Sequence, residues 1–321
     1  MINFTIDDVT VVVIGKNEES NLSRCFESVK KVTNNIVFVD SNSSDNSIEV
    51  AKKYDIPVIV VLDSNFYSAS LGRSVGATKV NTKLIQFLDG DMELDPEWLL
   101  EASNFMNKNV NIAVVHGFKK EFKKNTIDFI IKSDYKDWRA DYIQGAYLIQ
   151  SSVYEQAGGL DPRFPGEEER DLYVRIHELG YEAWYRHKLM ASHYDFKDRG
   201  WKYLLFSDVA GAISVPLVKS LFSGRIRSYI YVYRRLLLVL SLDLISLIAI
   251  LSFTWVGLGL MLVVQLLALG YVISIKRPGY FIIWKSALIN IHRTVRILNR
   301  NIDCKEQVIM SDADLTRESV E

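Results

Sequence analysis

The sequence predicts an α/β fold, with a mostly parallel sheet covered by helices on both faces, and a C-terminal pair of membrane-spanning helices. Two observations carry this prediction. Short apolar runs rich in β-branched residues alternate with amphipathic stretches of about 10 to 15 residues upstream of residue 90, an alternation typical of βαβ units. A much longer apolar run then fills residues 236–275.

Four short apolar runs are predicted to be strands, because continuous apolar segments of this length suit strands buried on both faces. They are residues 9–15, 35–40, 57–61 and 83–89, and the stretches 18–32 and 44–54 have the pattern of the intervening helices. Ligands of such sheets bind outside the carboxyl ends of the strands. The first candidates for a site are therefore the polar residues that follow the strands: Asn17, Glu18, Asp40, Asp89 and Asp91.

The run 236–275 is too long for one membrane pass. A single helix would extend about 60 Å, twice the roughly 30 Å hydrocarbon core, so two passes fit better. Asp243 is its only charged residue, and we expect it to pair with another helix or to mark a shallow segment. Basic residues flank both ends: Arg225, Arg227, Arg234 and Arg235 before the run, and Lys276, Arg277 and Lys285 after it.

These flanking charges place both ends of the hairpin on the cytoplasmic side of a cell membrane. A buried hairpin of a soluble protein is the less favoured alternative. The expected domains are a sheet domain (1–200), an interfacial linker helix (201–228), two transmembrane helices (229–275) and a cytoplasmic tail (276–321). The basic segment 117–124, "GFKKEFKK", is expected to be a solvated helix face rather than a site for an anionic acceptor.

Composition and motifs exclude several classes of function. A formal net charge of −1 leaves no overall field to recruit nucleic acid, so none is expected as a partner. Cys25 and Cys304 form no metal-ligand or redox spacing. The segment after the first strand, "IGKNEES", lacks the glycines of a dinucleotide-binding loop, and the chain has no P-loop.

The acidic segment "LDGDMELDPEW" divides into two parts. Asp95, followed by Pro96 and Glu97, has the pattern of a helix N-cap with proline at the first helical position. Asp89 and Asp91 come earlier, directly after a strand, and Gly90 between them allows a close approach of the backbone. Two carboxylates at a strand end suit Mg²⁺ or Mn²⁺, although a solvated turn remains the alternative.

Four ordered blocks together resemble the family 2 glycosyltransferases of GT-A fold, a Rossmann-like architecture, over residues 8–195. They are "VVVIGKNEESNLSRCFESV", "VFVDSNSSDNSIEVAKKY", "GRSVGATKVNTKLIQFLDGDMELDPEWL" and "QGAYLIQSSVYEQAGGLDPRFPGEEERDLYVRIHELGY". The resemblance implies an inverting, metal-dependent enzyme. It would move a sugar from a nucleotide-diphosphate sugar to a hydroxyl of a lipid-linked or cell-envelope glycan acceptor, as in polysaccharide biosynthesis.

The resemblance also implies roles for individual residues. Glu169 would be the catalytic base, at a position where the family has aspartate, with Glu168 and Gly145 on the acceptor side. Asp91 and His193 would hold Mg²⁺ or Mn²⁺. The nucleotide sugar would be bound by Asn17, Glu18, Asp40, Arg73 and Asp89.

Several of these roles have a purely structural alternative. Glu168 and Glu169 also suit an acidic first helical turn, Arg73 a helix surface, and His193 an ordinary core or surface position. For the whole chain, the alternatives are transfer to a polyprenyl phosphate, which needs no base, or a catalytically silent membrane protein that binds sugar nucleotides. A processive synthase is disfavoured, because the chain lacks the Gln-x-x-Arg-Trp motif.

Overall fold

The computed structural model describes residues 3–62, 64–123, 126–128, 136–194, 215, 218–219, 223–251, 255–274, 291–302 and 305–309. The chain divides into two compact units. One comprises residues 1–197 together with 301–321, and the other comprises residues 198–300. Each unit is described below by itself.

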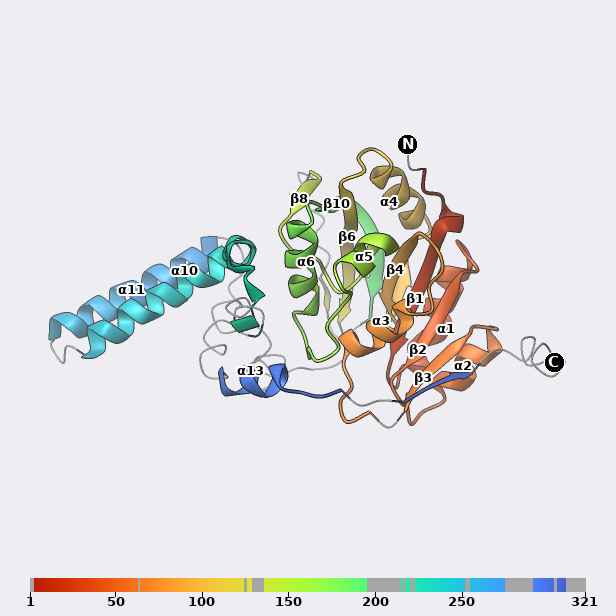
Figure 1. Ribbon diagram of the computed structural model, residues 1–321, viewed down its shortest axis with the longest axis horizontal. Helices are drawn as coiled ribbons and strands as arrows, with labels where there is room; N and C mark the ends of the chain where they lie inside the picture. Colours follow the sequence, from red (N-terminus) through yellow and green to blue (C-terminus); the bar gives the residue numbers. More distant parts are fainter. Residues whose placement is uncertain are drawn as a thin grey trace. The chain divides into compact units, whose positions relative to one another are not determined.

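The described residues of the first unit form a sheet of 11 strands, in the order β11-β3-β2-β1-β4-β9-β6-β10-β5, with β7 paired to β6 and β8 paired to β10 (Figure 1). The four predicted strands are confirmed within one residue at each end, and they pair in parallel. They are β1 (Val9–Gly15), β2 (Ile36–Asp40), β3 (Val58–Leu62) and β4 (Leu84–Asp89).

The remaining strands make the sheet mixed rather than mostly parallel, so that prediction is wrong beyond β4. β9 runs antiparallel to both β4 and β6, while β6 and β10 pair in parallel. Pairing partners distant in sequence set strand direction, and local patterns do not encode them. These strands are β5 (Met92–Leu94), β6 (Ile112–Lys123), β7 (Thr126–Asp128), β8 (Trp138–Ala140), β9 (Tyr147–Gln150), β10 (Glu182–His193) and β11 (Lys305–Ile309).

Two of these strands correct further expectations. The basic segment 117–124, expected to be a helix face, lies in β6 through residue 123. A strand end and a helix face that both carry charged residues can have the same composition, so composition cannot tell them apart. Here the pairing with β10 makes the segment a strand. β11 lies within the expected tail, yet it extends the sheet by pairing antiparallel with the edge strand β3.

Helices cover both faces of the sheet, as predicted. Val11, Val13 and Phe38 pack in one core with α1, α2 and α4, whereas Val12 and Val39, which point the other way, lie under Gly76 of α3. Neighbouring strand residues alternate between the faces, so this division follows from the pleat. The helices are α1 (Glu19–Lys30), α2 (Ser47–Lys53), α3 (Ala69–Ala77), α4 (Trp98–Met106), α5 (Ser151–Gln156) and α6 (Glu168–Glu178), with a short 3₁₀ turn at Ile6–Asp8.

The second unit contains a helical hairpin of α10 (Ile226–Leu251) and α11 (Trp255–Ser274), and the short helix α13 (Ile291–Leu298). α10 and α11 lie side by side (Figure 1), and Gln265 Nε2 donates to Ser246 Oγ across them at 2.7 Å. Among the described residues, no helix combines the length and the apolarity that a membrane crossing needs, so the two expected spans are unsupported. Most of the linker 201–228 and the side chain of Asp243 lie outside the described residues.

Candidate active site

The predicted site residues meet at the carboxyl edge of the parallel strands. Gly15 at the end of β1 pairs with Asp40 of β2, and Ile14 pairs with Asp89 of β4. Gly90 follows directly, and its N–H donates to the carbonyl of Ile14 at 2.8 Å. A Cβ on Gly90 would lie 3.3 Å from that carbonyl oxygen, so glycine permits the close approach of the backbone that the sequence predicted between the two aspartates.

Arg73 connects the acidic residues at this edge. It comes from α3 and is 3% exposed, which excludes the helix-surface alternative. Its Nη2 donates to Asp89 Oδ1 at 2.8 Å, and its Nη1 donates to Glu168 Oε1 at 2.9 Å and to Glu169 Oε1 at 2.8 Å. One guanidinium therefore joins the end of β4 to the first turn of α6.

The start of α6 presents its acid pair to this arginine. Glu167, at the N-cap, adopts the left-handed conformation with φ of 63°, which costs free energy for a residue with a side chain. Glu168 is 3% exposed and Glu169 is 13% exposed. A Cβ on Gly145 would lie 3.3 Å from Arg73 Nη2 and 3.5 Å from Glu169 Oε1, so Gly145 directly adjoins this cluster.

Burial and charge shift the protonation of these groups. Burial raises the pKa of Glu168 to about 8, and repulsion from Glu169 adds to burial while Arg73 opposes it. Burial also raises the pKa of Glu169, against the attraction of Arg73. For Arg73, burial lowers the pKa but the three carboxylates outweigh it, so the guanidinium stays charged. The acid pair therefore retains a proton that two exposed glutamates would lose near neutral pH.

Asp91 and His193 lie beside each other, as the metal-site prediction requires. His193 Nε2 is 3.3 Å from Asp91 Oδ2, and its Nδ1 is 2.6 Å from Glu121 Oε2. Burial lowers the pKa of His193, but the hydrogen bonds with Asp91 and Glu121 outweigh burial and raise it to about 9. The ring is thus oriented by one carboxylate and faces the other.

This donor set fits Mg²⁺ or Mn²⁺. One carboxylate and one imidazole are too few for a closed protein site, and no group of three or more potential ligands was found in the described part of the chain. These ions, however, often take most of their ligands from water and substrate phosphates. The Glu121 contact to Nδ1 is the arrangement that orients metal-binding histidines.

The loops after β1 and β2 bind each other around Asp40. Asp40 is buried, and Ser43 donates to both its carboxylate oxygens, from N at 2.7 Å and from Oγ at 2.5 Å. Ser43 Oγ in turn accepts from Asn17 N, and Asn17 Oδ1 accepts from Ser44 N, each at 2.8 Å. Burial raises the pKa of Asp40, against the Ser43 hydrogen bonds. Asp40 thus organises the loop edge through Ser43.

Glu18 and the helix-start residues have structural partners. Glu18 is buried at the N-terminus of α1, where its N–H donates to Ser47 Oγ at 3.0 Å and its Oε2 accepts from Asn21. Asp95 Oδ1 accepts from Glu97 N at 3.0 Å, and α4 begins at Trp98. The helix starts two residues later than predicted: Glu97, not Asp95, is its N-cap. Asp95 instead accepts a hydrogen bond in the turn that precedes the helix.

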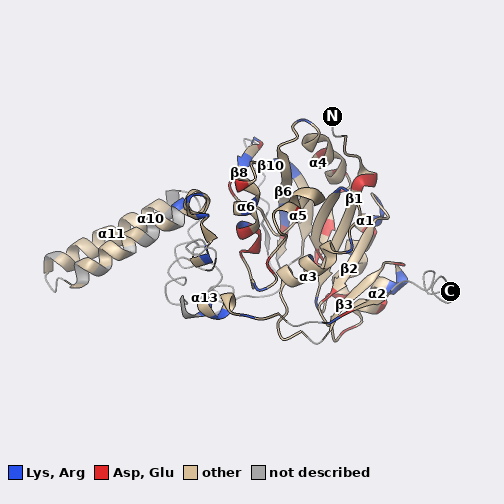
Figure 2. Cartoon of the chain, in the orientation of Figure 1, with Lys and Arg blue, Asp and Glu red and all other residues tan. Residues whose placement is uncertain are grey.

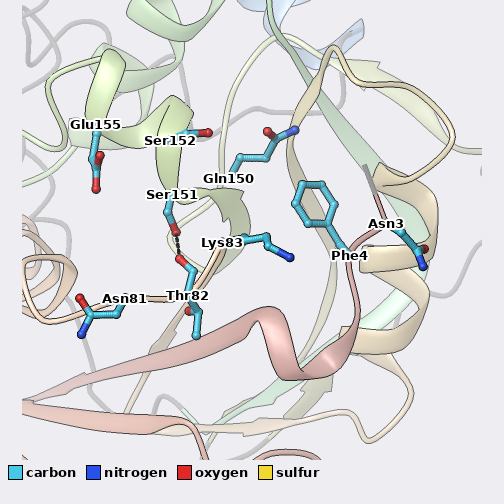
Figure 3. Close-up of a pocket in the computed structure, with 9 residues that line it drawn as sticks. All are labelled: Asn3, Phe4, Asn81, Thr82, Lys83, Gln150, Ser151, Ser152 and Glu155. Carbon is cyan, nitrogen blue, oxygen red and sulfur yellow. Dashed lines mark hydrogen bonds between the residues drawn. The ribbon is translucent and has the colours of Figure 1, made fainter. Parts of the chain in front are cut away.

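A separate cavity opens at the opposite edge of the sheet, where β4 begins and β9 ends (Figure 3). Its volume is about 560 Å³, and its lining includes Thr82, Lys83, Gln150 and Ser151. Ser151 Oγ donates to the carbonyl of Thr82, and Lys83 pairs with Asp8. These polar groups are engaged in holding the strand ends, so we assign the cavity no chemistry.

Residues 10–154 match the glycosyl transferase family 2 model. This stretch, less than half of the chain, is similar to a family 2 glycosyltransferase domain. Curated relatives include uncharacterized glycosyltransferases of Rickettsia typhi, 36% identical over 52 residues, and of Rickettsia conorii, 32% identical over 54 residues. The matches cover 16% and 17% of this chain and 18% and 19% of the relatives. The chain therefore spans less than a fifth of the length of the relatives it matches.

Solved structures support the GT-A fold of the glycosyltransferase domain. S. aureus TarS 1–349 in complex with UDP-GlcNAc is similar with a TM-score of 0.55 at 14% identity, over 66% of each chain. GalNAc-T7 with UDP, GalNAc and Mn²⁺ is similar with a TM-score of 0.50 at 18% identity, over 64% of this chain and 47% of that one. At such identity the likeness establishes the fold of the domain.

Sequence reasoning missed two residues of the glycosyltransferase domain's site. Glu121 lies in the segment interpreted for its lysines, and only the parallel register of β6 and β10 places it opposite His193. Tyr147 of β9 is buried beside the acid pair. No local pattern marks either residue, because both reach the site through strand pairing.

Proposed function

We propose that this chain is an inverting, metal-dependent glycosyltransferase that moves a sugar from a nucleotide-diphosphate sugar to a hydroxyl of a lipid-linked or cell-envelope glycan. The observation that carries the proposal is the arrangement around Arg73. The guanidinium of Arg73 binds both the aspartate at the end of β4, Asp89, and the acid pair at the start of α6, Glu168 and Glu169. UDP-GlcNAc and UDP with GalNAc and Mn²⁺ in structures of similar fold support this donor class.

On the donor side, Asp89 keeps a side chain 30% exposed and is assigned to the sugar nucleotide, with Asn17, Glu18 and Asp40 at the loop edge. Arg73 is already bound to three carboxylates, so we assign it to holding the acid pair rather than to offsetting the diphosphate. Asp91 and His193 would hold the metal ion, which when bound offsets the negative charge on the departing diphosphate.

On the acceptor side, Glu169 is the better base of the pair. It is more exposed than Glu168, and Arg73 fixes one of its oxygens. A raised pKa makes a carboxylate a stronger base near neutral pH. Glu169 accepts the proton of the acceptor hydroxyl while the hydroxyl oxygen bonds to the anomeric carbon and the bond to the diphosphate breaks on the opposite side. Attack from the opposite side inverts the anomeric centre.

We further propose that the α10–α11 hairpin attaches the enzyme to a membrane, with the glycosyltransferase domain on the cytoplasmic face. Figure 2 shows the described part of the hairpin almost free of charge beyond the start of α10. Among the described residues beyond Arg234, most exposed side chains of both helices are apolar, among them Leu244, Ile248, Leu262 and Leu266, each more than half exposed. Exposed apolar surface of this extent is typical of a contact with lipid or protein.

The membrane proposal is tested by flotation with vesicles of bacterial lipid extract. Exchanging both Leu262 and Leu266 for glutamine removes about 3 to 6 kcal/mol of apolar transfer free energy, and should reduce the bound fraction at least tenfold. Leu100→Gln changes an exposed leucine of α4, 50% exposed, and should leave flotation unchanged. Equal flotation of all three proteins would contradict membrane attachment through the hairpin.

The catalytic proposal is tested with Glu169→Gln. The variant should retain nucleotide binding and lose transfer to hydroxyl acceptors by about 10²- to 10⁴-fold, the usual contribution of a general base. Asp91→Asn should instead weaken Mn²⁺-dependent nucleotide binding. Transfer to a polyprenyl phosphate that survives Glu169→Gln would identify phosphate as the acceptor, and nucleotide binding without any turnover would identify a silent binding protein.

A further inference from the structure

Arg73 uses the two ends of one guanidinium for two parts of the site. Nη2 holds Asp89 at the end of β4, and Nη1 holds Glu168 and Glu169 at the start of α6. A guanidinium is planar and rigid, so its nitrogens move together. If its contact with Asp89 weakens, the whole group can shift towards the acid pair, because the three carboxylates share one positive charge.

The cluster also carries more negative charge than one arginine can neutralise. Three carboxylates bind the buried Arg73, and the acid pair is further faced by Glu167, the N-cap of α6, and by Tyr147 of β9. Burial and the neighbouring carboxylate hold the pKa of Glu168 at about 8. The pair is therefore partly protonated in the physiological range.

Three polar atoms of the cluster are buried without a hydrogen-bond partner among the described residues: Arg73 Nε, Glu168 Oε2 and Tyr147 Oη. Buried ion pairs that serve only the fold normally satisfy such atoms, because each unsatisfied one costs free energy. In a native structure, buried polar atoms left unsatisfied in this way call for an explanation, and a catalytic role is one. The three atoms give the cluster capacity for further hydrogen bonds.

We infer that Arg73 is a positioning residue that couples the donor side of the site to the acid pair, so that binding of a nucleotide diphosphate at Asp89 expels a proton from Glu168 and Glu169. The inference rests on the proposed function. When a hydroxyl of the nucleotide donates to Asp89, that carboxylate shares its charge, and Arg73 interacts more strongly with the pair. The proton passes to the buffer, and Glu169 is left ionised as a base once the donor is bound.

The test is isothermal titration calorimetry of nucleoside diphosphates (UDP, GDP, CDP and dTDP) near pH 8 with saturating Mn²⁺ throughout. Repeating the titration in buffers of different ionisation enthalpy gives the number of protons released for each nucleotide bound. The wild-type protein should release a fraction of a proton with the nucleotide that binds. Glu168→Gln, which removes the proton-holding carboxyl, should abolish that release and still bind the nucleotide.

Two variants separate the coupling from a structural role of Arg73. Arg73→Lys keeps the charge but loses the fork, and Gly145→Ala places a methyl group 3.3 Å from Nη2 without changing any charge. Both should bind nucleotide with little proton release. Arg175→Lys is the matched control, because Arg175 is also buried and is paired with a different carboxylate, Asp171. It should release protons as the wild type does.

The possible outcomes separate failure of the coupling from failure of the proposed glycosyltransferase function. If the wild type binds none of the nucleotides, the proposed function fails and the inference fails with it. If the wild type binds but releases no protons, or if Arg73→Lys and Gly145→Ala release as many as the wild type, coupling through Arg73 is refuted while the glycosyltransferase assignment stands. Loss of release in Arg175→Lys as well would also overturn the inference, because the effect would then follow general destabilisation.

Discussion

Glu168→Gln should stabilise this protein, and by more at pH 8 than at pH 5. Glu168 is 3% exposed, and its pKa lies near 8 in the folded protein, against an ordinary value of 4.5. Between these two pH values the folded state holds a proton that the unfolded state has lost. Stability therefore falls as the pH rises from 4.5, and the full penalty is reached once the pH passes 8.

The size of the penalty follows from the two pKa values. At about 1.4 kcal/mol for each pH unit, the interval from 4.5 to about 8 corresponds to a ceiling of about 5 kcal/mol. Glutamine resembles the protonated acid, and its amide oxygen can still accept from Arg73 Nη1, but a buried amide has its own desolvation cost. We therefore expect about 2 kcal/mol of net stabilisation at pH 8 and almost none at pH 4.5.

Urea unfolding of the wild type and the variant at pH 5, 6, 7 and 8 measures this difference. The gap in unfolding free energy between the two proteins should widen steadily with pH. Glu155→Gln, at an exposed glutamate of α5, is the control and should leave stability unchanged at every pH. A constant gap, or a variant that loses stability relative to the wild type as pH rises, would refute the view that Glu168 is held protonated by burial.

Two further predictions concern the core and the metal site. Gly76→Ala would bring a Cβ to 2.3 Å from Val12 Cγ1 and 2.9 Å from Val39 Cγ2. The overpacking should lower the free energy of unfolding by about 1 to 3 kcal/mol, measured as a lower urea midpoint. An unchanged midpoint would show that α3 does not pack on these strands. Glu121→Gln should weaken Mn²⁺ binding about 10- to 100-fold in calorimetry, because Glu121 orients the ring of His193, and unchanged affinity would remove His193 from the metal site.

The sequence predicted the parallel half of the fold because its signals there are local. Each of the strands β1 to β4 is a continuous apolar run, and the polar residues that follow them mark the ligand edge. Asp89 and Asp91 were found in this way, since strand, glycine and carboxylates are adjacent in the chain. The acid pair was found through the resemblance of its block, and the structure brings Glu168 and Glu169 to Asp89 through Arg73.

What the sequence could not predict depends on contacts between distant residues. The antiparallel pairing of β9 with β4 joins residues 147–150 to 84–87, and β11 joins the end of the chain to β3. Glu121 reaches His193 because β6 and β10 pair across 72 residues of sequence. The burial of Arg73 could not be predicted, because the sequence around a single arginine on a helix does not show that three carboxylates from other elements bind it.

The central claim is that the carboxyl edge of the sheet transfers a sugar from a nucleotide-diphosphate donor. The most direct measurement incubates labelled nucleotide sugars, Mn²⁺ and a membrane lipid extract with the wild type, Asp91→Asn and Glu169→Gln. The account predicts that the wild type moves label to the lipid fraction with release of nucleoside diphosphate, that EDTA and Asp91→Asn abolish this transfer, and that Glu169→Gln reduces it at least a hundredfold. Transfer at the wild-type rate by both variants would contradict the account.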